Sequence, residues 1–257
     1  MTDPDITLSE QAGVRYLHFG SVWVQGAMRM RRPWHIEIAY VALMQSWLLF
    51  LEPPKRLLQI GLGAAALTKH CYKNLPNSAI TAVESSGAVV AAARRFFALP
   101  EDDSRLTVLA DDGSKFLNKF LQKPKRKAFG ILQVDVYDQE ARGPVLDSLV
   151  FYQQCFDALD EPGILSVNLF GEAASYARNI KRIQEVFHGR VLTWPAVDAG
   201  NIVVLAFKGP KLEVSWQSLF ERARALESAY DLPAQKWLRN LKNHPAQTRA
   251  STTHLSL

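Results

Sequence analysis

Acidic side chains follow three apolar segments of the sequence, each at the point where a predicted strand ends. Glu84 follows AITAV, the pair Asp111-Asp112 follows LTVLA, and Asp135 follows GILQV, with Asp138 one turn further along. Because the carboxyl ends of parallel strands meet along one edge of a sheet, these carboxylates are expected to converge on one crevice. A carboxylate among apolar residues needs a cation or hydrogen-bond donors as its partner, and an amine substrate would supply both.

A glycine-containing turn precedes these acids. The segment Gly61-x-Gly63-x-x-Ala66 follows the apolar run LLQI and opens a predicted helix. The first glycine permits a tight turn, the second lets a ligand approach the backbone, and the small third residue permits close packing of helix on sheet. Taken alone, the pattern indicates either a nucleotide-binding turn or a tight strand–helix connection in an ordinary α/β core.

Each acid has a binding role and a plainer alternative. Glu84 could accept hydrogen bonds from both ribose hydroxyls of an adenosine, or it could cap a helix or face water. Asp112 could accept from an adenine amino group, or it could cap the predicted helix 114–122. Asp135 and Asp138 could bind an amine, or they could be surface carboxylates that begin a loop.

Alternating apolar strands and amphipathic helices position these residues. Strands are expected at 57–60, 80–84, 106–109, 128–134, 164–169, 191–193 and 202–207, and helices at 65–73, 88–98, 114–122, 146–159 and 173–187. This order predicts an α/β fold with a doubly wound, mostly parallel, Rossmann-like sheet of seven strands. The last two strands lack a helix between them, which indicates an antiparallel hairpin at one edge.

Three parts are expected along the chain. Residues 1–33 hold a short β-hairpin over 12–32, residues 34–210 form the nucleoside-binding catalytic domain, and residues 211–257 form a helical extension. The catalytic domain is expected to begin with a long helix over 34–51, ended by the following prolines. The extension is expected to hold helices at 215–230 and 233–241 and a frayed tail from His244.

Composition excludes several classes of protein. The 257 residues are 48% hydrophobic and include only two cysteines, so we expect a globular cytoplasmic protein without a disulfide framework. The histidines and cysteines lack metal-site spacing, so no metal is expected. The longest apolar run, 36–51, is too short to cross a membrane. The net charge of +5 sits in short local runs without a nucleic-acid motif, so a nucleic-acid partner is not expected.

Five motifs in order and spacing carry a family resemblance: LLQIGLGAAALTKH, AITAVESSGAVVAAARRFF, RLTVLADDGSKFL, ILQVDVYD and LDEPGILSVNLFGE. Over residues 12–208 the chain resembles the spermidine synthase (polyamine aminopropyltransferase) family, especially its shorter bacterial members. Most of these motifs are shared with class I methyltransferases, whose fold the resemblance implies. The D-x-x-D formed by Asp135 and Asp138 favours the aminopropyl branch.

The resemblance implies a role for each matching residue. The nucleoside of decarboxylated S-adenosylmethionine would be held by Gly61, Gly63, Glu84, Asp112, Gly113 and Gln25. Asp135 and Asp138 match the catalytic aspartates, and the polyamine substrate would contact Tyr40, Asp138 and Glu172. The implied reaction is attack of a diamine such as putrescine on the carbon beside the sulfonium, releasing 5′-methylthioadenosine. A homodimer through the hairpin and sheet edge is also expected.

Departures from the family pattern keep other functions open. Ala64 stands where the family carries an acid that contacts the amine of the aminopropyl group, and Gln139 replaces the proline after D-x-x-D. Ala64 would suit an S-adenosylmethionine-dependent methyltransferase, whose cofactor keeps its carboxylate. Occlusion of the pocket by Leu62 or Tyr137 would indicate an inactive nucleoside-binding homologue. The turn alone also leaves NAD-dependent chemistry open.

Overall fold

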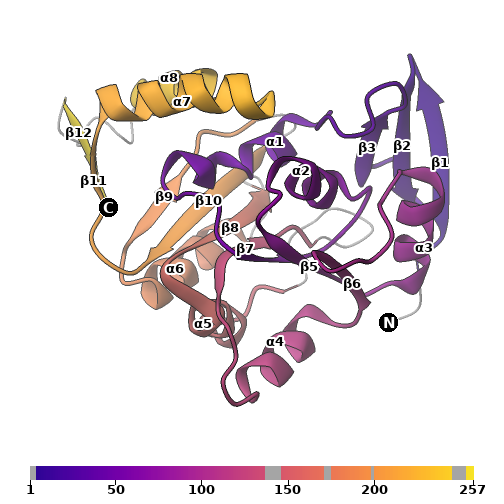
Figure 1. Ribbon diagram of the computed structural model, residues 1–257, viewed down its shortest axis with the longest axis horizontal. Coiled ribbons are helices and arrows are strands. Elements are labelled where there is room, and N and C mark those ends of the chain that lie inside the picture. Colours follow the sequence, from indigo (N-terminus) through magenta and orange to yellow (C-terminus); the bar gives the residue numbers. More distant parts are fainter. Residues whose placement is uncertain (1–3, 137–145, 171–174, 198–199, 245–252) are drawn as a thin grey trace.

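The computed structural model describes residues 4–136, 146–170, 175–197, 200–244 and 253–257 (Figure 1). Its central sheet has seven strands in the order β6-β5-β4-β7-β8-β10-β9. Their bounds are β4 Arg56–Ile60, β5 Ala79–Glu84, β6 Leu106–Ala110, β7 Phe129–Val134, β8 Leu159–Phe170, β9 Val191–Thr193 and β10 Asn201–Lys208. Strands β4 to β8 pair in parallel, whereas β10 pairs antiparallel with both β8 and β9. The predicted doubly wound, mostly parallel sheet with an antiparallel edge is confirmed.

Helices cover both faces of this sheet, as Figure 1 shows. Their bounds are α2 Ala66–Asn74, α3 Gly87–Phe96, α4 Gly113–Leu121, α5 Leu149–Ala158 and α6 Tyr176–Val186. Alternate strand residues point to opposite faces: Leu57 packs with the α2 side of the core, whereas Leu58 and Ile60 pack with α4, α5 and α6. The central strands β4 and β7 are therefore buried on both sides, as their continuous apolar runs predict.

The antiparallel hairpin expected over 12–32 is confirmed as β2 and β3, and a further strand, β1, extends it to a three-stranded sheet. Its strands are β1 Ile6–Gln11, β2 Val14–Phe19 and β3 Gly26–Arg29. Strand β1 was missed because four of its six residues are polar and its apolar alternation is limited to Ile6 and Leu8. Leu17 and Met28 attach this sheet to the main body by packing against Phe97.

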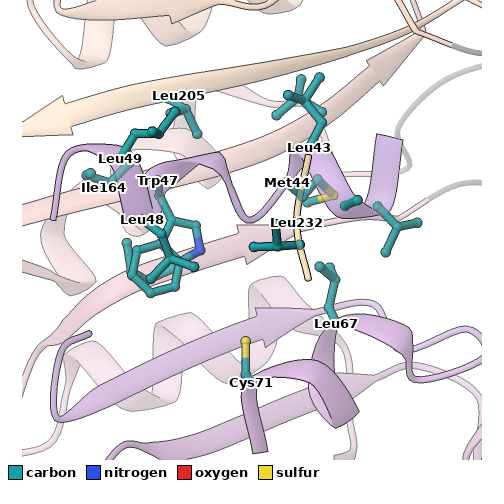
Figure 2. Close-up of a cluster of buried hydrophobic side chains, with 14 of the residues drawn as sticks. Leu43, Met44, Trp47, Leu48, Leu49, Leu67, Cys71, Ile164, Leu205 and Leu232 are labelled. Atoms are coloured by element: carbon teal, nitrogen blue, oxygen red, sulfur yellow. The ribbon is translucent and has the colours of Figure 1, made fainter. Parts of the chain in front are cut away.

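The long helix predicted over 34–51 is wrong. The segment forms a short helix α1, Ala39–Leu43, and a 3-10 turn η1, Ser46–Leu49, with the break at Met44 and Gln45 (Figure 2). The Met44 carbonyl accepts hydrogen bonds from the side chains of Gln133 at 3.1 Å and Ser166 at 3.0 Å. These partners come from distant strands, so the apolar run could not reveal them. No helix in the described part of the chain could span a membrane.

Buried amides join this break to the centre of the sheet. Gln59 of β4 donates to Gln133 of β7 at 2.8 Å and accepts from Thr68 of α2 at 2.7 Å. Gln45 accepts from the Trp47 indole at 3.0 Å. Each of these side chains is at most 1% exposed, so its hydrogen bonds within the protein must replace those that it would make with water. The network therefore holds α1 in one position over the sheet.

The C-terminal part consists of β11 Glu213–Ser215, α7 Trp216–Tyr230, α8 Ala234–Lys242 and β12 His254–Ser256. Side chains of α7 and α8 share a buried cluster with Trp47 and Leu48, so this part belongs to the main core. The prediction of a frayed tail from His244 is wrong for residues 254–256, because they form β12, which pairs with β11, and Leu255 is buried.

His70 of α2 makes the stability of the fold sensitive to acid. It is buried and bonds to the Tyr230 carbonyl at 3.2 Å, and burial lowers the pKa of His70 from 6.5 to about 4. The fold therefore favours the neutral ring, so this contribution is complete above pH 6.5 and is lost as the pH falls toward 4. We expect wild type to lose about 2 to 3 kcal/mol between pH 7.5 and 4.5 through this group.

Urea unfolding at both pH values, with wild type and His70→Gln compared, measures this loss. The variant has no ring to protonate and should lose less stability than wild type over the same interval. An equal loss in the two proteins would assign the acid sensitivity to other groups.

Candidate active site at the carboxyl ends of the parallel strands

The turn between β4 and α2 has a backbone that only glycine fits at its first position. Gly61 has φ of +93°, and a Cβ there would lie 2.0 Å from the Asp135 carbonyl oxygen. The Gly61 N–H donates to the Val83 carbonyl of β5, and the Asp135 N–H donates to the Ile60 carbonyl of β4. The turn is therefore held between the ends of β5 and β7.

Glu84 lies against the same turn from the end of β5. One carboxylate oxygen accepts from the Leu62 N–H at 2.9 Å, and the other accepts from the Ser86 N–H at 3.0 Å. Since Gly61 touches Asp135 and Leu62 touches Glu84, the structure brings the two acidic residues to one turn. The predicted strand-end residues thus gather at one edge of the sheet.

Asp135 is held by two donors from different elements. Its Oδ1 accepts from Asn168 Nδ2 of β8 at 3.0 Å, and its Oδ2 accepts a long hydrogen bond of 3.3 Å from the Tyr40 hydroxyl of α1. Burial raises the pKa of Asp135 above the ordinary value of an aspartate, while these two hydrogen bonds act in the opposite direction. The arrangement gives a positioned carboxylate with increased affinity for a proton.

The acids after β6 have structural partners. Asp112 caps α4, because its Oδ1 accepts from the Lys115 N–H at 2.8 Å. Asp111 accepts from Lys119 at 2.8 Å, and this hydrogen bond lowers the pKa of Asp111. A Cβ on Gly113 would lie 2.4 Å from the Ile60 side chain, so packing requires glycine there. The capping alternative for Asp112 is therefore correct, and its Oδ2 has no partner in the described chain.

The start of β3 lies beside the glycine turn. A Cβ on Gly63 would lie 3.0 Å from the Gln25 carbonyl, and a Cβ on Gly26 would lie 2.6 Å from the Ala64 Cβ. The Nε2 atom of Gln25 is buried and makes no hydrogen bond with the described residues. The N-terminal sheet therefore closes one side of the site and brings an unsatisfied amide donor to it.

A polyamine aminopropyltransferase from Neisseria meningitidis is 34% identical to this chain over 243 residues, which is 93% of this chain and 89% of the relative. The chain belongs to the polyamine aminopropyltransferase family. No known family model matches the sequence. The resemblance inferred from the five motifs is confirmed.

Solved structures agree with this family in their fold. A probable spermidine synthase from Corynebacterium glutamicum gives a TM-score of 0.69 at 16% identity, covering 91% of this chain and 88% of that one. Human methyltransferase-like protein 13 in complex with SAH gives 0.64 at 21% identity, covering 75% and 90%. The class I methyltransferase-like fold expected from the sequence is confirmed.

Ala64, where the aminopropyltransferase pattern has an acid, is buried rather than open to a ligand. It is 3% exposed and packs with Leu17, Met28 and Phe97 beneath the N-terminal sheet. A Cβ on Gly26 would lie 2.6 Å from the Ala64 Cβ, so the backbone of β3 approaches Ala64 closely. The Leu62 side chain is buried and packs in the core cluster that includes residues of α1 and α2.

Asn168 is a site residue that the sequence interpretation missed. Its signal was a polar residue in the apolar run ILSVNLF, two positions after Ser166 on the same face of β8. Buried polar residues at this spacing indicate that one face of the strand meets polar partners. Here these partners are Asp135 for Asn168 and the Met44 carbonyl for Ser166.

Four of the residues named from the sequence belong to segments that the structure does not describe. Asp138, Glu172, Tyr137 and Gln139 lie outside the described residues. A cavity of about 920 Å³ lies elsewhere, between residues 31–39, the end of α2 and the α7–α8 junction. None of the predicted site residues lines it.

Proposed function

We propose that this protein transfers the aminopropyl group of decarboxylated S-adenosylmethionine to a diamine such as putrescine and releases 5′-methylthioadenosine. The observation that carries the proposal is the Asp135 carboxylate, held by Tyr40 and Asn168 beside a glycine turn that Glu84 holds from its other side. This geometry joins a positioned base to a nucleoside-type turn in a chain of the polyamine aminopropyltransferase family.

The nucleoside is assigned to the turn and its neighbours. The carboxylate of Glu84 already accepts two backbone hydrogen bonds, and an ionised carboxylate has about four acceptor positions, so the ribose hydroxyls can use the others. Oδ2 of Asp112 is assigned to the adenine amino group, beside Gly113, and the Gln25 amide to a further nucleoside acceptor. The glycine backbone at Gly61 and Gly63 lets the ligand approach closely.

Asp135 is assigned as the base. A protonated alkylamine has a pKa of about 10.4, so exposing its lone pair at pH 7 costs about 4 to 5 kcal/mol. As the nitrogen attacks the carbon, the N–C bond forms, the C–S bond breaks, the sulfonium becomes a neutral thioether and the amine proton passes to Asp135. The raised pKa of Asp135 favours this acceptance of a proton. Asp138, Glu172 and Tyr40 are assigned to holding the amine.

A methyltransferase is the second candidate, and the burial of Ala64 favours it. With Ala64 at this position, the turn of this protein offers no acid to hold the amine of decarboxylated S-adenosylmethionine. A cofactor that keeps its carboxylate would not require an acid at this place. The two functions differ in the group transferred, so the product separates them.

Calorimetry and product analysis test the proposal. The purified protein is titrated with decarboxylated S-adenosylmethionine, S-adenosylmethionine and 5′-methylthioadenosine, and then incubated with each sulfonium compound and a panel of diamines. We expect 5′-methylthioadenosine and a product heavier than the diamine by one aminopropyl group, both seen by mass spectrometry. A methylated product would favour the second candidate, and no binding of either sulfonium at millimolar concentration would end both.

We also infer a cytoplasmic homodimer. Both cysteines are free and buried, which suits a reducing compartment. Exposed apolar side chains gather on the N-terminal sheet and its β2–β3 connection, and a second copy could cover them. They are Leu8, Val22, Trp23, Val24 and Met30. Light scattering of the purified protein measures its mass, and a monomer would contradict the inference.

Glu84→Gln is expected to weaken binding of 5′-methylthioadenosine by about 10- to 100-fold. The amide oxygen can still accept from the Leu62 N–H, but the amide nitrogen cannot accept from the Ser86 N–H, and the side chain loses the negative charge that strengthens hydrogen bonds from ribose hydroxyls. Calorimetry measures the change, with Glu101→Gln, an exposed acid, as the matched control. Equal affinity in Glu84→Gln and the control would remove Glu84 from the nucleoside site.

A further inference from the structure

Two separate basic segments of the chain meet at the amino ends of β4 and β7. The segments are residues 53–56 and 123–127, and we call their cations the basic patch. Its six members are Lys55, Arg56, Lys123, Lys125, Arg126 and Lys127. The four cations of residues 123–127 are exposed, as is Lys55. In the sequence these are two short runs about 70 positions apart, and only the fold makes them one surface.

Three contacts hold the two segments together. Gly130 packs so closely on Pro54 that a Cβ would lie 2.3 Å from the proline ring. The Arg56 guanidinium donates to the Lys127 carbonyl and lies 4.6 Å from the centre of the Phe129 ring. Lys55, Arg56 and Lys127 thereby line a common hollow of about 300 Å³. Packing of Gly130 on Pro54 and of Arg56 on Phe129 therefore fixes the two segments next to each other, in addition to the hydrogen bond from Arg56.

Within the described chain the basic patch has more cations than acids. None of its six cations makes an ion pair with a described residue, and Asp160 is the acid that lines the hollow. Other surface cations do have partners, for example Arg32 with Asp231 and Lys119 with Asp111. Six cations beside a single lining acid of the described residues leave a net positive charge, which raises the local positive potential and attracts anions.

The basic patch is separate from the candidate active site. Arg56 begins β4 and Phe129 begins β7, whereas Gly61 and Asp135 follow the other ends of the same strands. A ligand at the basic patch therefore does not compete with the proposed co-substrate for the candidate active site.

We propose that the basic patch binds the phosphate backbone of a nucleic-acid duplex without reading its sequence. Six cations from two segments are more than a single phosphate group pairs with, so the patch suits a ligand that presents several phosphates. None of the exposed large apolar side chains of the described chain lies in either segment, so the patch lacks the anchors that bind a membrane surface. Phe129 is buried, so no aromatic ring of the patch stacks on unpaired bases.

The test measures binding of a fluorescent 20-base-pair DNA duplex by anisotropy at 50 to 200 mM salt. The patch variant carries Lys55→Gln, Lys123→Gln, Lys125→Gln and Lys127→Gln, and the control variant carries Lys73→Gln, Lys181→Gln, Lys211→Gln and Lys236→Gln. Both variants lose the same charge. We expect the patch variant to bind at least about tenfold more weakly and to reduce the slope of log affinity against log salt by about 3 to 4. The control should change both quantities much less.

Two results would overturn the proposal: no duplex binding by wild type at 50 mM salt, whether or not it binds phosphatidylserine vesicles, or equal losses in the two variants. Circular dichroism checks that both variants are folded. Aminopropyl transfer should be unchanged in the patch variant, so failure of this proposal and failure of the proposed function are separate results.

Discussion

Asp135→Asn is expected to reduce kcat for aminopropyl transfer by about 10²- to 10⁴-fold, the usual range for loss of a positioned acid or base. The amide has nearly the same shape, but it cannot accept the proton that the attacking amine must lose. Steady-state formation of 5′-methylthioadenosine measures the loss, and calorimetry with the same nucleoside should give an affinity close to that of wild type.

Asp157→Asn is the matched control, because Asp157 is an exposed aspartate of α5 that bonds only to Gln153 among the described residues. It should keep wild-type activity. Full turnover in Asp135→Asn would reject its role as the base. A similar loss of nucleoside affinity and turnover would instead indicate that Asp135 holds the shape of the turn.

The sheet could be predicted from the sequence because its signal is local. Each parallel strand is a short apolar run that ends at glycine or an acid, and burial on both faces requires such a run. The boundaries of β4, β5 and β7 lie within one residue of their predicted positions. Parallel order then brings Glu84 and Asp135 to the same edge of the sheet, where both contact the turn after β4.

The errors share a different physical cause, which is dependence on distant partners. The pattern of residues 34–51 predicts a helix, but the Met44 carbonyl accepts hydrogen bonds from Gln133 and Ser166 of two central strands. Strand β12 is too short and polar to be recognised, and it forms because β11 offers an edge. Asn168 reads as a residue of an apolar strand, and its hydrogen bond to Asp135 crosses from β8 to the end of β7.

The buried amide network also explains how α1 contributes to the candidate site. Tyr40 lies on α1, whose end at Met44 is held by Gln133 and Ser166. The same face of the sheet that carries Gln133 carries Asp135 two residues later, and the face that carries Ser166 carries Asn168. Gln133 and Ser166 thus fix the end of α1, and Asn168, on the same face of the sheet, holds the proposed base Asp135.

Gly61→Ala is expected to lower the free energy of unfolding by about 3 to 4 kcal/mol and to abolish nucleoside binding. The new methyl group would lie 2.0 Å from the Asp135 carbonyl oxygen at a φ of +93°, so β4 and β7 would have to separate at the site. Backbone strain of this kind costs about 1 to 3 kcal/mol, and the displaced strand adds to it. Urea unfolding and calorimetry with 5′-methylthioadenosine measure the two effects.

Gly63→Ala separates this steric effect from the general cost of alanine in a left-handed conformation. Gly63 has φ of +50°, and its Cβ would meet the Gln25 carbonyl at 3.0 Å, a contact that a shift of a few tenths of an ångström relieves. Ala65 adopts φ of +57° two residues later, so this turn already accommodates alanine in that region. We expect Gly63→Ala to cost about 1 kcal/mol. Equal destabilisation by the two changes would show that the Gly61–Asp135 contact does not hold the turn.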